Sequence, residues 1–148
     1  MTLADWQKNG WLSTHQTSAR EIGDLLAVVE RDLADSATEP LSADWRLNIA
    51  YNAALQAATA ALAASGYRAS REQHHYRVIQ SLRETIGANQ QLVTTFDAFR
   101  KKRNITGYER VGAVSDADAV QMRELAIAIH GRVIAWLAKT RPDLLAER

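Results

Sequence analysis

The order of apolar and polar residues predicts helices along most of the chain, because apolar positions recur every three or four residues. The first such pattern follows Ser18, and Glu21 three residues later completes the sequence signature of a capping box. We therefore predict a helix that begins at Ser18, in a segment that ends at Pro40. Its apolar face comprises Ile22, Leu25, Leu26, Val29 and Leu33.

A second helix is predicted from Ser42 or Asp44, either of which can cap its first turn, to about Ser65. Gly66 is a natural stop, because glycine readily adopts the left-handed conformation that ends many helices. The helix carries a face of small side chains, which would let another helix approach closely. These residues are Ala50, Ala54, Ala57, Ala58 and Ala61.

Two further helices are predicted on either side of a tight connection at residues 88–89. Ser70 with Gln73 has the spacing of a capping box and is expected to open the first of them, which Gly87 ends. The apolar positions of this helix are Val78, Ile79, Leu82 and Ile86. The next helix carries Leu92, Phe96 and Phe99 on one face.

A long fifth helix is predicted after Ser115, which forms a capping-box pair with Asp118, and Pro142 lies just beyond its end. Its apolar stripe is Met122, Leu125, Ala126, Ile129, Val133, Trp136 and Leu137. Together these patterns predict an all-α fold, an antiparallel bundle of four to five helices. We assign residues 17–148 to the bundle domain and residues 1–16, which include Trp6 and Trp11, to an N-terminal arm.

Composition limits the classes of protein to which this chain can belong. The length of 148 residues suits one domain. Formal net charge is only +1, from 18 basic and 17 acidic residues, so any binding of a polyanion must be local. The absence of cysteine excludes disulfides and cysteine nucleophiles. The first residues do not resemble a signal peptide and no apolar stretch reaches the length of a membrane span, so we expect a cytoplasmic protein with no membrane partner.

Basic residues gather in FRKKRNITGYER, residues 99–110, where the fourth helix ends. Continuing the apolar face of that helix by one turn brings Arg103 toward the core side, with Arg100 and Asn104 on the same flank. Because a charge is costly in such a place, Arg103 is a candidate for a specific role. The two lysines of the segment fall on other faces and are expected to be solvated: Lys101 and Lys102.

His75 continues the apolar face of the third helix backward by one turn. At 1.5 Å per residue, His75 and Arg103 each lie about 20 Å from the connection at residues 88–89, so both should reach the same end of the bundle. Tyr108 is expected to return to that end. The predicted anion site therefore comprises Arg100, Arg103, Asn104, His75 and Tyr108. The alternative is that the basic residues complement the helix dipole and the histidine is structural.

Other kinds of site find little support in the residue spacing. One Glu-x-x-His pair occurs, Glu72 with His75, but di-iron bundles need a second pair and further carboxylates. His15, His75 and His130 come from distant segments, and nothing in their spacing supports a shared metal ion. We therefore expect no metal site and no cofactor.

With these residues placed, the chain resembles the HEPN family, small helical bundles of bacterial toxin-antitoxin and defence systems. The matching features are AYNAALQAATAALAASGYR on the second helix, His75 after the Gly-Tyr-Arg turn, and RKKRNITGY. The resemblance covers about residues 18 to 138. It implies a dimer in which an Arg-x4-6-His signature from both chains forms a metal-independent ribonuclease site. Arg103 and Asn104 match its start, but Tyr108 stands where the histidine is expected, so activity stays open.

The resemblance implies an RNA- or nucleotide-binding component of a toxin-antitoxin or defence system that functions as a homodimer and has a cognate antitoxin protein as a partner. In this hypothesis Arg103 contacts phosphate, Asn104 orients it, Tyr108 hydrogen-bonds or stacks, and Arg100 and His75 support them. A positioned histidine could move the proton of a 2′-hydroxyl, so ribonuclease activity is one form of this hypothesis. The alternative is a non-catalytic dimeric helical module that binds a partner protein.

Overall fold

The computed structural model describes residues 1–106, 114–146 and 148, and most of them are helical. The helices are α1 (Leu3–Lys8), α2 (Ala19–Asp35), α3 (Ala43–Ala64), α4 (His74–Ser81), α5 (Gln90–Thr106) and α6 (Asp116–Thr140), with a 3-10 helix η1 at Pro142–Leu145. The strands are β1 (Leu12–Thr14) and β2 (Tyr67–Ala69). The predicted all-α character is confirmed, with the addition of one small two-stranded sheet that the sequence patterns did not predict.

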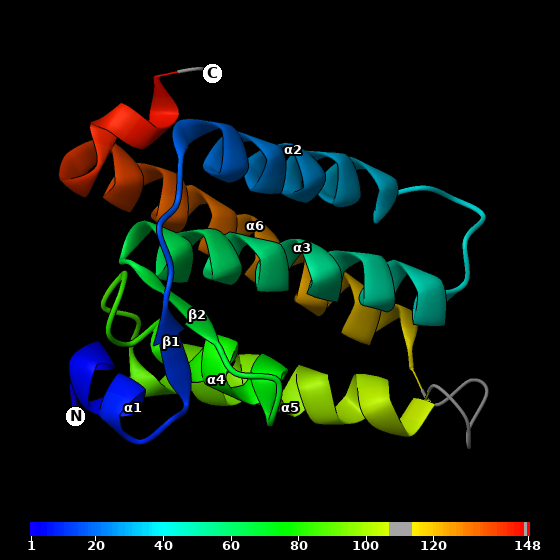
Figure 1. Ribbon diagram of the computed structural model, residues 1–148. Helices are drawn as coiled ribbons and strands as arrows, with labels where there is room; N and C mark the ends of the chain where they lie inside the picture. Colours follow the sequence, from blue (N-terminus) through cyan, green and yellow to red (C-terminus); the bar gives the residue numbers. More distant parts are fainter. Residues whose placement is uncertain (107–113, 147) are drawn as a thin grey trace.

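Four long helices form the body of the protein (Figure 1). Helices α2 and α5 run in one direction and α3 and α6 in the opposite direction. Helix α3 packs most extensively, against α2 on one side and α6 on another. Its predicted small-residue face is fully buried at Ala50, Ala54, Ala57, Ala58 and Ala61. Small side chains thus let α3 lie close to its neighbours.

Serine caps begin three of these helices: two were predicted, and for α3, where Ser42 and Asp44 were both candidates, the cap is Ser42. The Ser18, Ser42 and Ser115 hydroxyls each accept the backbone N–H of the third residue of the helix they cap: α2, α3 and α6. Of these three, only Ser115 forms a complete capping box, with Asp118. At Ser18 the box is half formed, because the Glu21 carboxylate is bound by Thr17 and His15 instead. Gly66 ends α3 at a φ of +95°, the conformation that glycine adopts at least cost.

The prediction for the third helix was wrong at both ends. Helix α4 begins at His74, and its N-cap is Gln73 with a φ of +54° and no side-chain cap. Ser70 does not cap it, because the Ser70 hydroxyl donates to the backbone oxygen of Gly10, 2.7 Å away. The helix ends at Ser81 rather than near residue 87, and turns occupy residues 82–86.

The first 16 residues, predicted to form an arm, lie against the rest of the chain. Strand β1 pairs antiparallel with β2, and Leu12 is opposite Ala69. Trp6 and Leu12 are buried in the same apolar core as the bundle helices, and Trp6 meets Trp11 edge to face at 6.1 Å between ring centroids. The strand pair therefore brings Trp11 close to the start of α4, where Ser70 donates its backbone N–H to the Trp11 oxygen.

Within the described ranges, no helix combines the length and apolarity needed to cross a membrane.

Candidate functional site

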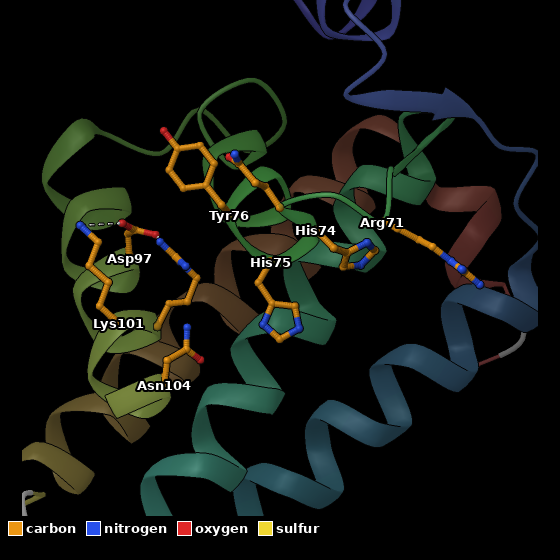
Figure 2. A pocket seen from close by; sticks show the side chains of 9 residues that line it. Arg71, His74, His75, Tyr76, Asp97, Lys101 and Asn104 are labelled. Carbon is orange, nitrogen blue, oxygen red and sulfur yellow. Dashed lines mark hydrogen bonds and ion pairs between the residues drawn. The ribbon is translucent and has the colours of Figure 1, made fainter. Parts of the chain in front are cut away.

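A pocket of about 560 Å³ lies between the start of α4 and the second half of α5 (Figure 2). Asp97, Lys101 and Asn104 reach it from α5, and His75 reaches it from α4. His74 and Arg71 lie farther from α5, at the opposite edge in this view. The complete lining is Arg71, Gln73, His74, His75, Tyr76, Asp97, Arg100, Lys101 and Asn104.

Three of the five predicted site residues line this pocket: His75, Arg100 and Asn104. Arg103 is half-buried beside it, where its guanidinium carbon lies 5.0 Å from the ring centroid of Tyr51. Tyr108 lies outside the described residues. Helices α4 and α5 thus bring His75, Arg100 and Asn104 together in one pocket.

A buried carboxylate that the sequence analysis did not predict holds Arg100 in place. Asp97 is 8% exposed, and its Oδ1 accepts from Arg100 Nε at 2.7 Å. Lys101 Nζ lies 3.5 Å from the other carboxylate oxygen. On its other side, the Arg100 guanidinium carbon is 5.6 Å from the Tyr76 ring centroid. Because the ion pair engages Nε, the two Nη groups of Arg100 can serve a further acceptor.

The pocket carries a local positive charge that the whole chain lacks. Its lining has three permanent cations, Arg71, Arg100 and Lys101, against the single carboxylate of Asp97, an excess of two positive charges. Arg71 is exposed and makes no ion pair with any other described residue. Cations concentrated along one concave surface attract anions more strongly than the net charge of +1 would suggest.

His75 is a neutral group held by a buried tyrosine from α3. Its Nδ1 lies 3.0 Å from the hydroxyl of Tyr51, which is 1% exposed. Burial lowers the pKa of His75 below its usual value, and the nearby charges of Arg103, His74 and Arg100 lower it further. Burial also raises the pKa of Tyr51 to about 12, so the phenol keeps its proton near neutral pH.

These protonation states indicate the direction of the hydrogen bond. The Tyr51 phenol needs an acceptor, and His75 Nδ1 is its partner among the described residues. We infer that Tyr51 donates to Nδ1, which leaves the proton of the neutral imidazole on Nε2. In this tautomer His75 can donate a hydrogen bond to an anion in the pocket.

The two lysines expected to be solvated are both engaged by carboxylates. Lys102 Nζ lies 2.7 Å from Asp118 Oδ2 and so links α5 to the first turn of α6. Lys101 lies on the rim of the pocket near Asp97. The expectation holds for Lys101, which is exposed, and was wrong for the half-buried Lys102. Helix periodicity says which face a lysine occupies, but not that the neighbouring helix α6 supplies a carboxylate there.

The histidines considered for a metal site serve separate networks. His15 Nε2 is 2.7 Å from the Glu21 carboxylate, whereas His75 contacts Tyr51. His130 Nε2 is 3.4 Å from the Glu30 carboxylate. Among the described residues, no three His, Asp or Glu side chains group as metal ligands would.

Several residues that line or adjoin the pocket were missed by sequence reasoning, for different reasons. Asp97 lies three residues before Arg100 and four before Lys101, the spacing of helical ion pairs, so this signal was present in the sequence. Tyr51 and Tyr76 carried no such signal, because each meets the site through packing between helices.

Taken together, these side chains can bind an oxyanion through charge and directed donors, and can pack an aromatic ring beside it. Comparison with known proteins assigns the chain to no family: no family model, no curated protein and no solved structure matches it.

Proposed function

We propose that the pocket between α4 and α5 binds phosphate groups of RNA or of a nucleotide, and that the chain is a HEPN-like component of a toxin-antitoxin or related defence system. The observation that carries the binding proposal is the ion pair between Arg100 and Asp97, within a pocket that has an excess of two positive charges. An arginine fixed through Nε presents its remaining donors in a set geometry, which lowers the entropy cost of binding phosphate.

Most groups at the pocket have a role in this proposal. Arg71, Arg100 and Lys101 attract and bind phosphate oxygens, and Asn104 orients them. His75 donates from Nε2. Tyr76, half-buried beside the Arg100 guanidinium, offers a ring on which a base can stack. Arg103 acts through its charge, which adds to the larger effect of burial in lowering the pKa of His75.

Binding is the function that we propose, and cleavage of the bound RNA would require a further condition at His75. A general base at Nε2 must be unprotonated, whereas the inferred tautomer has its proton there. Ribonuclease activity through His75 would therefore need the proton to move to Nδ1, with Tyr51 then accepting the hydrogen bond. In the same hypothesis Tyr108, which stands where the HEPN signature has its histidine, stacks on a base or forms a hydrogen bond with the ligand.

Fluorescence anisotropy with a labelled single-stranded RNA tests the binding proposal. The double variant Arg71→Ala, Lys101→Ala should bind at least tenfold more weakly than wild type. It should also reduce the slope of log K against log salt by about 0.7 per lost phosphate contact. Arg20→Ala is the matched control, because Arg20 is exposed on α2 and does not line the pocket. Equal loss in the control, or no loss in the double variant, would exclude this pocket.

Cleavage is tested separately, by incubating the same RNA with the protein in EDTA. Activity that disappears in Arg103→Ala and in His75→Ala, with helicity retained, would support a metal-independent ribonuclease. Binding with no cleavage would identify a binding protein.

The alternative proposal is a dimeric module that binds a partner protein, such as a cognate antitoxin. One observation favours it: Trp45 at the start of α3 is 62% exposed and Val120 in the first turns of α6 is 49% exposed. Exposed apolar side chains of this size often lie in protein interfaces. Analytical ultracentrifugation tests the homodimer, and Trp45→Lys should dissociate it if this surface forms the interface.

A further inference from the structure

A row of alternating aromatic rings and guanidinium groups leads away from the candidate pocket. The Arg77 guanidinium carbon lies 3.8 Å from the ring centroid of Trp11 and 5.4 Å from that of Tyr76. The Arg100 guanidinium carbon lies 5.6 Å from the same Tyr76 ring. The order is therefore Trp11, Arg77, Tyr76, Arg100, and it ends at the ion pair with Asp97.

A second pocket, of about 300 Å³, lies at the Trp11 end of this row. Trp11, Arg77 and Glu72 contribute to its lining. Gln73 lines both this pocket and the one between α4 and α5, so the two adjoin. The charges of Arg77 and Glu72 offset each other, which distinguishes the second pocket from the strongly positive first one.

The surrounding structure holds Trp11 and Arg77 in place. Strand β1 pairs with β2, and the Trp11 oxygen accepts the backbone N–H of Ser70 at 3.0 Å. The Ser70 hydroxyl is bound to Gly10, which ties the N-terminal segment to the start of α4. Arg77 makes no ion pair with the other described residues, and the Trp11 ring face takes the place of a carboxylate.

We infer that the Trp11–Arg77 pocket is a second nucleotide subsite, so that the ligand is single-stranded RNA lying across both pockets rather than a mononucleotide. This inference rests on the proposed function of the first pocket. Aromatic rings and guanidinium planes bind unstacked bases, which a single strand offers and a duplex does not. Both guanidinium carbons lie within 5.6 Å of the Tyr76 ring centroid, so neighbouring nucleotides of one strand reach both pockets.

The charge difference between the pockets sets what each contributes. The first pocket attracts phosphate and makes binding sensitive to salt. The second has no excess charge and contributes base stacking and the hydrogen-bond donors of Arg77. Loss of Trp11 should therefore weaken binding of an oligonucleotide while leaving its salt dependence nearly unchanged.

Isothermal titration calorimetry with two probes tests the inference: uridine 3′-phosphate, which fills one subsite, and the single-stranded tetranucleotide of uridine, which fills both. Wild type should bind the tetranucleotide at least tenfold more tightly than the mononucleotide. Trp11→Ala should remove most of this difference and leave binding of uridine 3′-phosphate unchanged. Trp11→Phe should restore part of it, because a smaller ring still stacks.

If Trp11→Ala does not fold, a second variant, Arg77→Gln, keeps the test decisive because it leaves the indole of Trp11 in place. Arg77→Gln should also reduce the preference for the tetranucleotide. Equal affinity of wild type for the two probes, or a preference that survives both substitutions, would overturn the second subsite while leaving the first intact. A duplex that binds as tightly as the single strand would overturn it as well. If neither probe binds wild type, the proposed function itself fails, and this inference with it.

Discussion

The hydroxyl of Tyr51 lies 3.0 Å from Nδ1 of His75, and this contact joins the centre of the helical core to the candidate pocket. Tyr51 comes from α3 and is almost fully buried, while His75 lies in the first turn of α4 and lines the pocket. A single hydrogen bond therefore sets both the orientation and the tautomer of the histidine.

Tyr51→Phe should remove the preference of His75 for the tautomer with its proton on Nε2. The phenol proton no longer occupies Nδ1, so the imidazole should become a mixture of its two neutral forms, visible in the ¹⁵N chemical shifts of His75. The free energy of unfolding should fall by about 1 kcal/mol, the usual net value of one hydrogen bond. Tyr67→Phe is the control, because the Tyr67 hydroxyl makes no hydrogen bond with another described residue. Unchanged His75 shifts in Tyr51→Phe would contradict the assigned tautomer.

Arg103→Gln should raise the pKa of His75 toward its ordinary value without reaching it. The positive charge of Arg103 is the second cause of the lowered pKa, and burial, the largest cause, remains in the variant. An NMR titration of the His75 ring measures the change, and Arg20→Gln serves as a charge-matched control. A pKa that stays where it is in wild type would mean that Arg103 does not act on this histidine.

The lowered pKa of His75 also makes stability depend on pH. Between the folded pKa and the ordinary value of 6.5, the unfolded chain binds more protons than the folded one, so the free energy of unfolding should fall as pH decreases through this window. His75→Gln removes this contribution. Urea unfolding at pH 7.5 and at pH 5 should show a smaller pH-dependent loss in the variant than in wild type. The same loss in both proteins would assign the effect to other groups.

The Asp97–Arg100 pair should be energetically coupled. Both side chains are mostly buried, at 12% and 21% exposure, so solvent screens them only in part. A double-mutant cycle with Asp97→Ala and Arg100→Ala should give a coupling free energy of about 1 kcal/mol. The exposed pair Arg141–Asp143 should give less, because its charges are well solvated. Equal coupling in the two cycles would argue against a fixed Arg100.

Helix α3 should not tolerate larger side chains on its buried face. Ala58→Leu adds volume at a fully buried position between close helices and should lower the free energy of unfolding by about 1–3 kcal/mol. Ala27→Leu makes the same change at an exposed position of α2 and should shift it by less than about 0.5 kcal/mol. Urea denaturation compares the two, and a tolerated Ala58→Leu would show that the packing has space to spare.

Sequence periodicity predicted most of the secondary structure because its signals are local. A serine cap acts within three residues, and an apolar face repeats within each turn, so the starts at Ser18, Ser42 and Ser115 could be predicted without knowledge of the fold. The same reasoning predicted that His75 would lie near Arg100 and Asn104, and these residues do line one pocket. The constant-rise estimate, however, assumed a helix that continues to residue 87, whereas α4 ends at Ser81.

Only the tertiary structure decided which partners these residues meet. The pairing of Leu12 with Ala69 joins segments too short for an alternating pattern to predict, and it drew Ser70 away from the helix that it was expected to cap. The same pairing brought Trp11 to Arg77, and the packing of α3 brought Tyr51 to His75. Residue spacing determines the face on which a side chain lies, whereas a contact between distant segments depends on how the whole chain packs.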